Sequence, residues 1–423
     1  MNIPRVDLAL FAVVLLSGIL FGAAQVATMP GVPSHGRYHP SDMDDLQEQL
    51  LGKDVMPKPY AAASDHPAWI TICGVYQKAS SATGLRGMQL WNLVTPVLLG
   101  VNLCLFLGIA RHLRFTRGQA IGLTAVFLAT GATITWSVVL ETHVLAPTGL
   151  LLAALILTSR RFTSRLWSRP TPGAVALYGV AIALAASITI TNLMLAILAV
   201  LPVNVVRHPN PARIANRTMK RLPTLMTAFL VGIGLLAFVH LAGWYLTQDR
   251  EMRQFLEVLT RGAGDGLLLI NGGPGSRWES ILALSWIAPP LNAYMGSPEA
   301  LDLLALERSW STAPAYLSGL IVLLLTICSL RVVSARAMFI PAFALFGVVL
   351  HSIYGMGESF LFCANYTWAT VLSIGILGRA LAPRQLTWIA CLLAAVMLIV
   401  NLMIWQHGLE WLIEHDHLLP SAH

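Results

Sequence analysis

Three aspartates follow the first apolar segment of the chain, at Asp42, Asp44 and Asp45. A carboxylate just beyond a membrane span, in a partly dry pocket, is suited to act as a general base. Asp42 and Asp45 are three residues apart, so they share a helical face if Ser41 caps a helix there. Acids at a helix start are also favoured by the helix dipole, so capping and catalysis both remain open for this motif.

A second polar cluster, Glu141-Thr142-His143, falls in a short turn between two apolar segments. Glu141 and His143 face one point in a turn and, with an acid from the earlier segment, form a candidate site for a divalent metal ion. Simple hydration of the turn is the competing interpretation. Further polar groups fall on the same predicted side of the membrane: Asp65, His66, His240 and His351.

Glu358 lies between two apolar segments near the C-terminal end. A carboxylate this close to the bilayer is costly, so it marks a candidate functional site. Asn365, Tyr366 and Trp368 follow it and offer groups that stack on a sugar or hydrogen-bond to it. An interfacial aromatic belt is the alternative interpretation.

The residues from Asp249 to Glu257 have the pattern of an amphipathic helix lying on the membrane. Arg250 and Arg253 in this stretch are candidates for binding a lipid phosphate, with surface solvation as the alternative. The glycines of residues 262–275 are not followed by Gly-Lys-Ser/Thr, so they do not predict a nucleotide-phosphate loop.

Apolar elements must position all of these groups, because 56% of the residues are hydrophobic and only 11% are charged. Soluble domains carry about 25% charged residues. Apolar runs of about 20 residues predict membrane-spanning helices rather than barrel strands. The composition predicts an all-α polytopic membrane protein, a single transmembrane domain over 1–423, with spans near 8–28, 88–110, 119–138, 144–159, 173–188, 190–206, 223–247, 313–330, 337–354, 366–381 and 385–406.

The charges fix a predicted orientation for these spans. Alternate loops and the N-terminus hold 17 of the 27 basic residues but a single acid, Asp7, out of 20 acids. Positive loops stay in the cytoplasm, so the N-terminus is predicted to be cytoplasmic and the C-terminus outside. The basic residues lie in short loops between apolar spans, which argues against nucleic acid as a partner. Two long outer segments, 30–87 and 248–312, then carry most of the acids.

The first apolar run is too long for a typical signal peptide and is predicted to be an uncleaved span. The five cysteines are spread singly and have no metal-binding spacing. Threonines 130, 133, 135, 189 and 191, with Asn192, are the few polar residues at depth, and they are predicted to pack helices or cap broken ones.

The pattern resembles the GT-C class of membrane glycosyltransferases, in the branch similar to protein mannosyltransferases and bacterial enzymes that use polyprenyl-phosphate sugars. The resemblance rests on one span followed by a long outer segment with acids near its start, on Asp65-His66-Pro67, on Glu141 in a tight turn, and on Gly357 to Phe362 ahead of the penultimate span. The large C-terminal outer domain of many members has no counterpart here.

The resemblance implies inverting transfer of a sugar from a polyprenyl-phosphate donor to an acceptor glycan, lipid or protein at the outer face of a bacterial inner membrane. It implies that one of Asp42, Asp44 and Asp45 is the base, and that Glu141 with His143 holds a metal or orients the donor phosphate. Two alternatives share the topology, a surface-polysaccharide polymerase or ligase and a non-enzymatic flippase or transporter of lipid-linked sugar.

Overall fold

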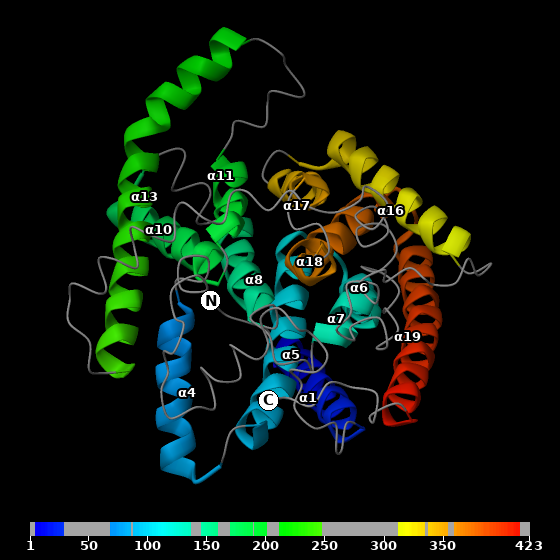
Figure 1. Cartoon of the computed structure of the whole chain (residues 1–423). Helices are drawn as coiled ribbons and strands as arrows, with labels where there is room; N and C mark the ends of the chain where they lie inside the picture. The colour runs from blue at the N-terminus through cyan, green and yellow to red at the C-terminus, as the bar shows by residue number, and fades with distance from the viewer. Residues whose placement is uncertain are drawn as a thin grey trace.

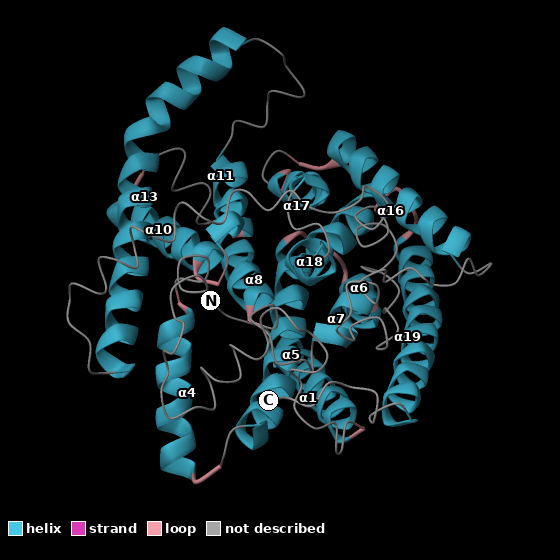
Figure 2. Cartoon of the chain, in the orientation of Figure 1, coloured by secondary structure: helices cyan, strands magenta, loops and turns pink. Residues whose placement is uncertain are grey.

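The computed structural model of the chain describes residues 5–28, 68–85, 88–136, 145–159, 170–188, 190–200, 211–247, 312–334, 337–353 and 359–414. Within these ranges the chain is almost entirely helical and forms no strand (Figure 2). The helices are α1 Arg5–Ala27, α4 Trp69–Thr83, α5 Met88–His112, α6 Arg117–Ala129, α7 Gly131–Trp136, α8 Ala146–Thr158, α10 Pro172–Ala186, the 3-10 helix η3 Ile190–Leu193, α11 Met194–Val200, α13 Pro211–Thr247, α16 Thr312–Val332, α17 Phe339–Ile353, α18 Ser359–Gly378 and α19 Pro383–Glu414.

These helices make the chain a membrane-embedded helical protein. Four of them have segments long and apolar enough to cross a bilayer: Asp7–Ala27, Gln89–His112, Met219–Gly243 and Pro383–Gln406. Shorter apolar helices occur at Ala146–Thr158, Pro172–Ala186, Leu317–Val332 and Phe339–Leu350. Each predicted span coincides with a helix or a pair of helices, while eleven crossings of the membrane stay a prediction.

The centre of the bundle consists of α5, α8 and α18 (Figure 1). Helix α18 packs on α16 and α17 on one side and on α6, α7 and α8 on the other. Large side chains that are wholly buried fill this centre: Trp91, Trp368, Phe106, Phe115, Phe339 and Phe343. By contrast, α1, α13, α16 and α19 expose rows of leucines and isoleucines on their outer faces, as helices in contact with lipid do.

Helices α1 and α5 approach each other closely because both carry small residues where they cross. Gly18 and Gly22 are four apart on α1, the small-xxx-small spacing of membrane helix pairs. A Cβ on Gly18 would lie 2.7 Å from the Cα of Gly100, and one on Gly22 would lie 2.9 Å from the Cα of Pro96. The first helix is therefore packed tightly against α5 within the bundle.

Two predicted spans are interrupted. Span 119–138 divides at Thr130, whose ψ of 144° ends α6, and its hydroxyl accepts from the Thr133 N–H at the start of α7. The Ala129 carbonyl, near this break, accepts from the Asn401 amide of α19 at 2.7 Å. In span 190–206 the 3-10 helix η3 precedes α11, which ends at Val200. The prediction that threonine caps a broken helix is confirmed at Thr130.

Three helices extend more than five residues beyond their predicted spans. Helix α13 starts at Pro211 rather than at 223, since the basic residues before Pro223 continue the helix and Pro211 suits its first turn. Helix α18 starts at Ser359 rather than at 366, and α19 runs on to Glu414. Hydropathy sets the length of the apolar stretch, whereas backbone hydrogen bonding carries the helices into polar sequence.

Candidate functional site at the acidic end of the bundle

Two ends of the bundle are distinguished by the segments that join the helices. The acidic end is where residues 29–67, 137–144, 248–311 and 354–358 connect, and the basic end holds Arg111 to Arg117 and Arg379 to Arg384. The sequence places all candidate site residues at the acidic end. Most of them lie outside the described residues: Asp42, Asp44, Asp45, Asp65, His66, Glu141, His143, Arg250, Arg253 and Glu358.

The described residues at the acidic end show where the chain enters and leaves those segments. Ala68, two residues after His66, is 8% exposed and donates its N–H to the Ser187 carbonyl at 2.7 Å. Its side chain packs with Ala146, at the start of α8, and with Ile188. Ala68, which directly follows Asp65-His66-Pro67, therefore packs against the start of α8. Helix α8 in turn follows Glu141-Thr142-His143 in the chain.

Helix α4 continues from this contact and is held against α13. The Thr71 hydroxyl donates to the Val239 carbonyl at 2.5 Å, and a Cβ on Gly243 would lie 2.6 Å from the Thr71 N. Helix α4 ends at Gly84, whose φ of 72° is the left-handed conformation that glycine accepts at low cost. The neighbour of Val239 is His240, one of the histidines singled out from the sequence, and it is 4% exposed.

Several polar side chains at the acidic end are buried, and some of their atoms have no hydrogen-bond partner within the part of the chain that the structure describes. Asn365 near the start of α18 is 2% exposed, and both its Nδ2 and its Oδ1 lack a partner. The same holds for Thr135 Oγ1 on α7 and Asn192 Nδ2 in η3, and for the indole Nε1 atoms of Trp91 and Trp405. Helix α18 packs against α7, so Asn365 and Thr135 belong to neighbouring helices.

Buried polar groups are nearly always hydrogen-bonded in native proteins, because leaving one unpaired costs about 1–3 kcal/mol. A buried group that lacks a partner among the described residues therefore calls for an explanation, and a polar ligand at this end of the bundle is the one that we pursue. The amide of Asn365 supplies two donors and an acceptor, and the two indoles supply donors. Groups of these types form hydrogen bonds with the hydroxyl groups of a sugar.

Tyr366, like its neighbours Asn365 and Trp368, is a sequence-predicted sugar-binding residue that lies in the described part of the chain. It is 3% exposed, and its ring carbon Cδ1 lies 2.6 Å from where a Cβ on Gly347 of α17 would be. Trp368 donates its indole N–H to the backbone carbonyl of Asn365 at 2.7 Å. Its ring stacks on that of Phe343, with 6.0 Å between the ring centroids. A sugar reaches the Tyr366 ring in this arrangement only if α17 and α18 separate.

The sequence singled out Asn365 as a hydrogen-bonding group, whereas it interpreted Thr135 and Asn192 as packing or capping residues. Trp91 and Trp405 were missed, although a tryptophan near a predicted span end was a usable signal. In the described ranges no three His, Cys, Asp or Glu side chains gather as metal ligands, and the predicted ligands Glu141 and His143 lie outside those ranges. The metal stays a prediction.

The chain matches no protein-family model and no curated protein in the comparisons made. The functional argument therefore depends on the residues and the geometry of the acidic end.

Proposed function

We propose that the protein is a membrane glycosyltransferase that moves a sugar from a polyprenyl-phosphate carrier to an acceptor hydroxyl at the acidic end of the bundle, which faces away from the cytoplasm. The acceptor oxygen bonds to the anomeric carbon as the bond from that carbon to the phosphate oxygen breaks. The acceptor proton passes to a carboxylate, and the polyprenyl phosphate leaves. Attack from the face opposite the phosphate inverts the anomeric configuration.

The packing of Ala68 against the start of α8 is the observation that carries this proposal. His66 precedes Ala68 by two residues, and His143 precedes Leu145, a neighbour of that contact, by two residues. Two residues of chain span at most about 7 Å. The proposal therefore brings the Asp65-His66 pair and the Glu141-His143 turn, which are far apart in sequence, to one region of the acidic end, since the described residues that follow them are in contact.

The proposal gives the aspartates Asp42, Asp44 and Asp45 the role of the base, since they are the acids closest in sequence to α1. Glu141 and His143 orient the donor phosphate or hold a divalent metal ion, and no step is assigned to the ion. The remaining predicted residues bind donor and acceptor, namely Asp65, His66, Arg250, Arg253 and Glu358. Tyr366 joins them only if α17 and α18 separate, because its ring packs against Gly347. The unpaired amide of Asn365 suits the hydroxyl groups of the transferred sugar.

The test compares membranes that contain the wild-type chain with membranes that contain the D42A, D44A and D45A triple variant. The wild type is expected to release polyprenyl phosphate from a panel of polyprenyl-phosphate sugars, and the triple variant to lose at least 100-fold of that rate, the usual contribution of a general base. The matched control removes Glu48 and Asp54, two acids of the same segment, and is expected to keep activity. Equal turnover by the wild type and the triple variant would refute the assigned base.

A second candidate function, translocation of a lipid-linked sugar, is favoured by the two interrupted spans. Breaks such as the one at Thr130 occur in transporters where backbone groups line a substrate path. Proteoliposomes separate the two functions. A transporter moves the intact lipid-linked sugar across the bilayer without releasing polyprenyl phosphate, whereas a transferase releases it only when an acceptor is present.

A further inference from the structure

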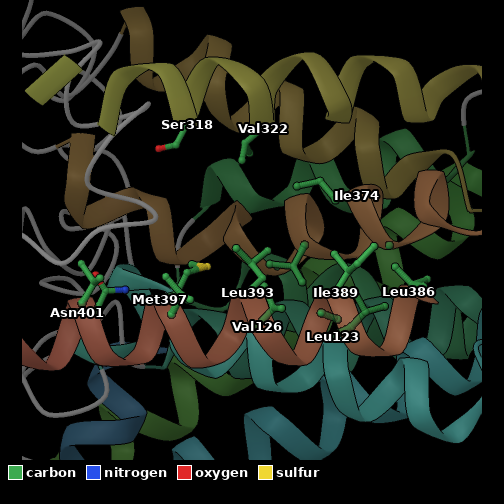
Figure 3. A pocket seen from close by; sticks show the side chains of 15 residues that line it. Leu123, Val126, Ser318, Val322, Ile374, Leu386, Ile389, Leu393, Met397 and Asn401 are labelled. Carbon is green, nitrogen blue, oxygen red and sulfur yellow. The ribbon is translucent and has the colours of Figure 1, made fainter. Parts of the chain in front are cut away.

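An apolar groove of about 290 Å³ lies between α16 and α19, and its floor is formed by α6 and α18 (Figure 3). Val322 of α16 and Leu393 of α19 line its two walls, and Gly375 of α18 lies in its floor. The polar side chains that line it, Ser318 and Asn401, belong to the half nearer the acidic end. The rest of the groove is lined by apolar side chains, including that of Met397.

The groove runs lengthwise along α19. From Leu386 to Asn401 it extends about 22 Å at a rise of 1.5 Å per residue, most of a hydrocarbon layer about 30 Å thick. Ile389 and Val396 of α19, which line the groove, are 51% and 52% exposed, so the groove opens to the lipid-facing surface. Its shape and lining fit a single hydrocarbon chain that lies along the bundle.

At the basic end the groove adjoins a positive charge. Gly375 packs on Phe115, with 3.3 Å between the position of a Cβ on the glycine and the ring carbon Cζ of Phe115. The Arg379 guanidinium lies over the same ring, 4.1 Å from its centroid, and donates to the Leu113 carbonyl. One aromatic ring therefore separates the guanidinium from a residue of the groove floor.

Among the described residues at the basic end, cationic side chains outnumber acidic ones. Asp7 accepts from Arg117 at 2.9 Å and lies 3.8 Å from Arg111, and thereby balances part of their charge. Arg114 and Arg379 have no such carboxylate among the described residues. Burial lowers the pKa of Arg379 from its ordinary value, and the positive charge of Arg114 lowers it further.

We propose that the groove and the arginines Arg114 and Arg379 form a binding site for one anionic glycerophospholipid of the leaflet at the basic end. The phosphate lies at the two guanidinium groups, and one acyl chain lies in the groove. Trp388 on α19 is 75% exposed one turn beyond Arg384, the position of an interfacial tryptophan at headgroup level. This site is at the opposite end from the proposed sugar transfer and does not depend on it.

The test titrates the purified full-length chain, after removal of bound lipid, with phosphatidylglycerol or phosphatidylcholine and counts bound lipids by native mass spectrometry. The wild type is expected to bind one phosphatidylglycerol in preference to phosphatidylcholine. Each basic residue near a membrane surface contributes about five-fold to the affinity for an anionic lipid. R114Q is therefore expected to bind phosphatidylglycerol about five-fold more weakly than the wild type, and the double variant R114Q/R379Q about 25-fold more weakly. K220Q, an exposed cation on α13, is the matched control and is expected to keep the wild-type affinity.

The chain part of the site is tested by filling the groove. L393W and, as a second variant, V396F put bulk into the groove from exposed wall positions, and both are expected to weaken phosphatidylglycerol binding at least ten-fold. L392W on the outer face of the same helix is expected to bind normally. Equal binding of both lipids, wild-type affinity in both groove-filling variants, or preference for polyprenyl phosphate over phosphatidylglycerol would overturn the proposal.

Discussion

At the scale of single residues, the two buried asparagines Asn365 and Asn401 are in opposite situations. The Asn401 amide donates to the Ala129 carbonyl at 2.7 Å and so stabilises the end of α6. The Asn365 amide is buried to a similar degree, but neither of its polar side-chain atoms has a partner among the described residues. The same side chain therefore contributes a stabilising hydrogen bond at the first position and no such bond within the described residues at the second.

We predict that alanine at the two positions separates stability from activity. N401A leaves a buried carbonyl with one fewer partner and is expected to lower the free energy of unfolding by about 1–3 kcal/mol. N365A removes an unpaired group and is expected to leave thermal stability in detergent unchanged, while the rate of polyprenyl phosphate release falls at least ten-fold. A loss of stability in N365A comparable to that in N401A would show that Asn365 is a packing residue.

At the scale of helices, glycines decide how closely neighbouring elements pack. Between α1 and α5 the contact is glycine on glycine, since a Cβ on Gly18 meets the backbone of Gly100 rather than a side chain that can turn away. Between α10 and α13, a Cβ on Gly232 would lie 2.6 Å from Ile182, and one on Gly179 would lie 2.6 Å from Val231. Helix association in lipid depends on this close packing, because water gives no hydrophobic drive between spans.

G18L is therefore expected to force α1 away from α5. Overpacking costs about 1–3 kcal/mol, and here the obstructing atoms belong to backbone, so we place the loss at the upper end of that range. Thermal unfolding of the purified chain in detergent measures it. S17L, at the adjacent exposed position, is the control and is expected to lie within about 0.5 kcal/mol of the wild type.

At the scale of the whole molecule, the described structure separates positive and unpaired polar groups along the bundle. The arginines Arg111, Arg114, Arg117 and Arg379 lie at one end, and the unpaired Asn365 lies towards the other. The proposed orientation places the arginines in the cytoplasm. The two proposed sites, one for sugar transfer and one for an anionic lipid, then face opposite sides of the membrane.

Cysteine labelling tests this orientation. A membrane-impermeant maleimide added to intact cells is expected to label S81C on the exposed side of α4 and to leave R114C unlabelled until the cells are opened. Native Cys73 on the same helix is expected to stay unlabelled. Burial raises its pKa to about 12, so the thiol is protonated at neutral pH and the reactive thiolate is nearly absent. Labelling of R114C in intact cells would reverse the proposed orientation.

The sequence by itself determined that the protein is helical and membrane-embedded, and it located each apolar helix. Hydrophobic composition and charge placement suffice for this, because lipid admits only segments whose backbone groups are hydrogen-bonded internally. Helix ends were less predictable. Thr130 interrupts a continuous apolar run, and Pro211 begins a helix in basic sequence, since caps and backbone geometry rather than hydropathy set these boundaries.

Only the tertiary structure decided which distant residues meet. The contact of Ala68 with Ala146 and the stacking of Arg379 on Phe115 join segments that are far apart in the chain, and no local pattern encodes such pairs. Similarly, the sequence ranked Tyr366 and Asn365 alike as polar groups near a span end. Packing against Gly347 covers the tyrosine ring and leaves the asparagine amide buried and unpaired, because partners in the folded chain, not residue type, determine whether a polar group is satisfied.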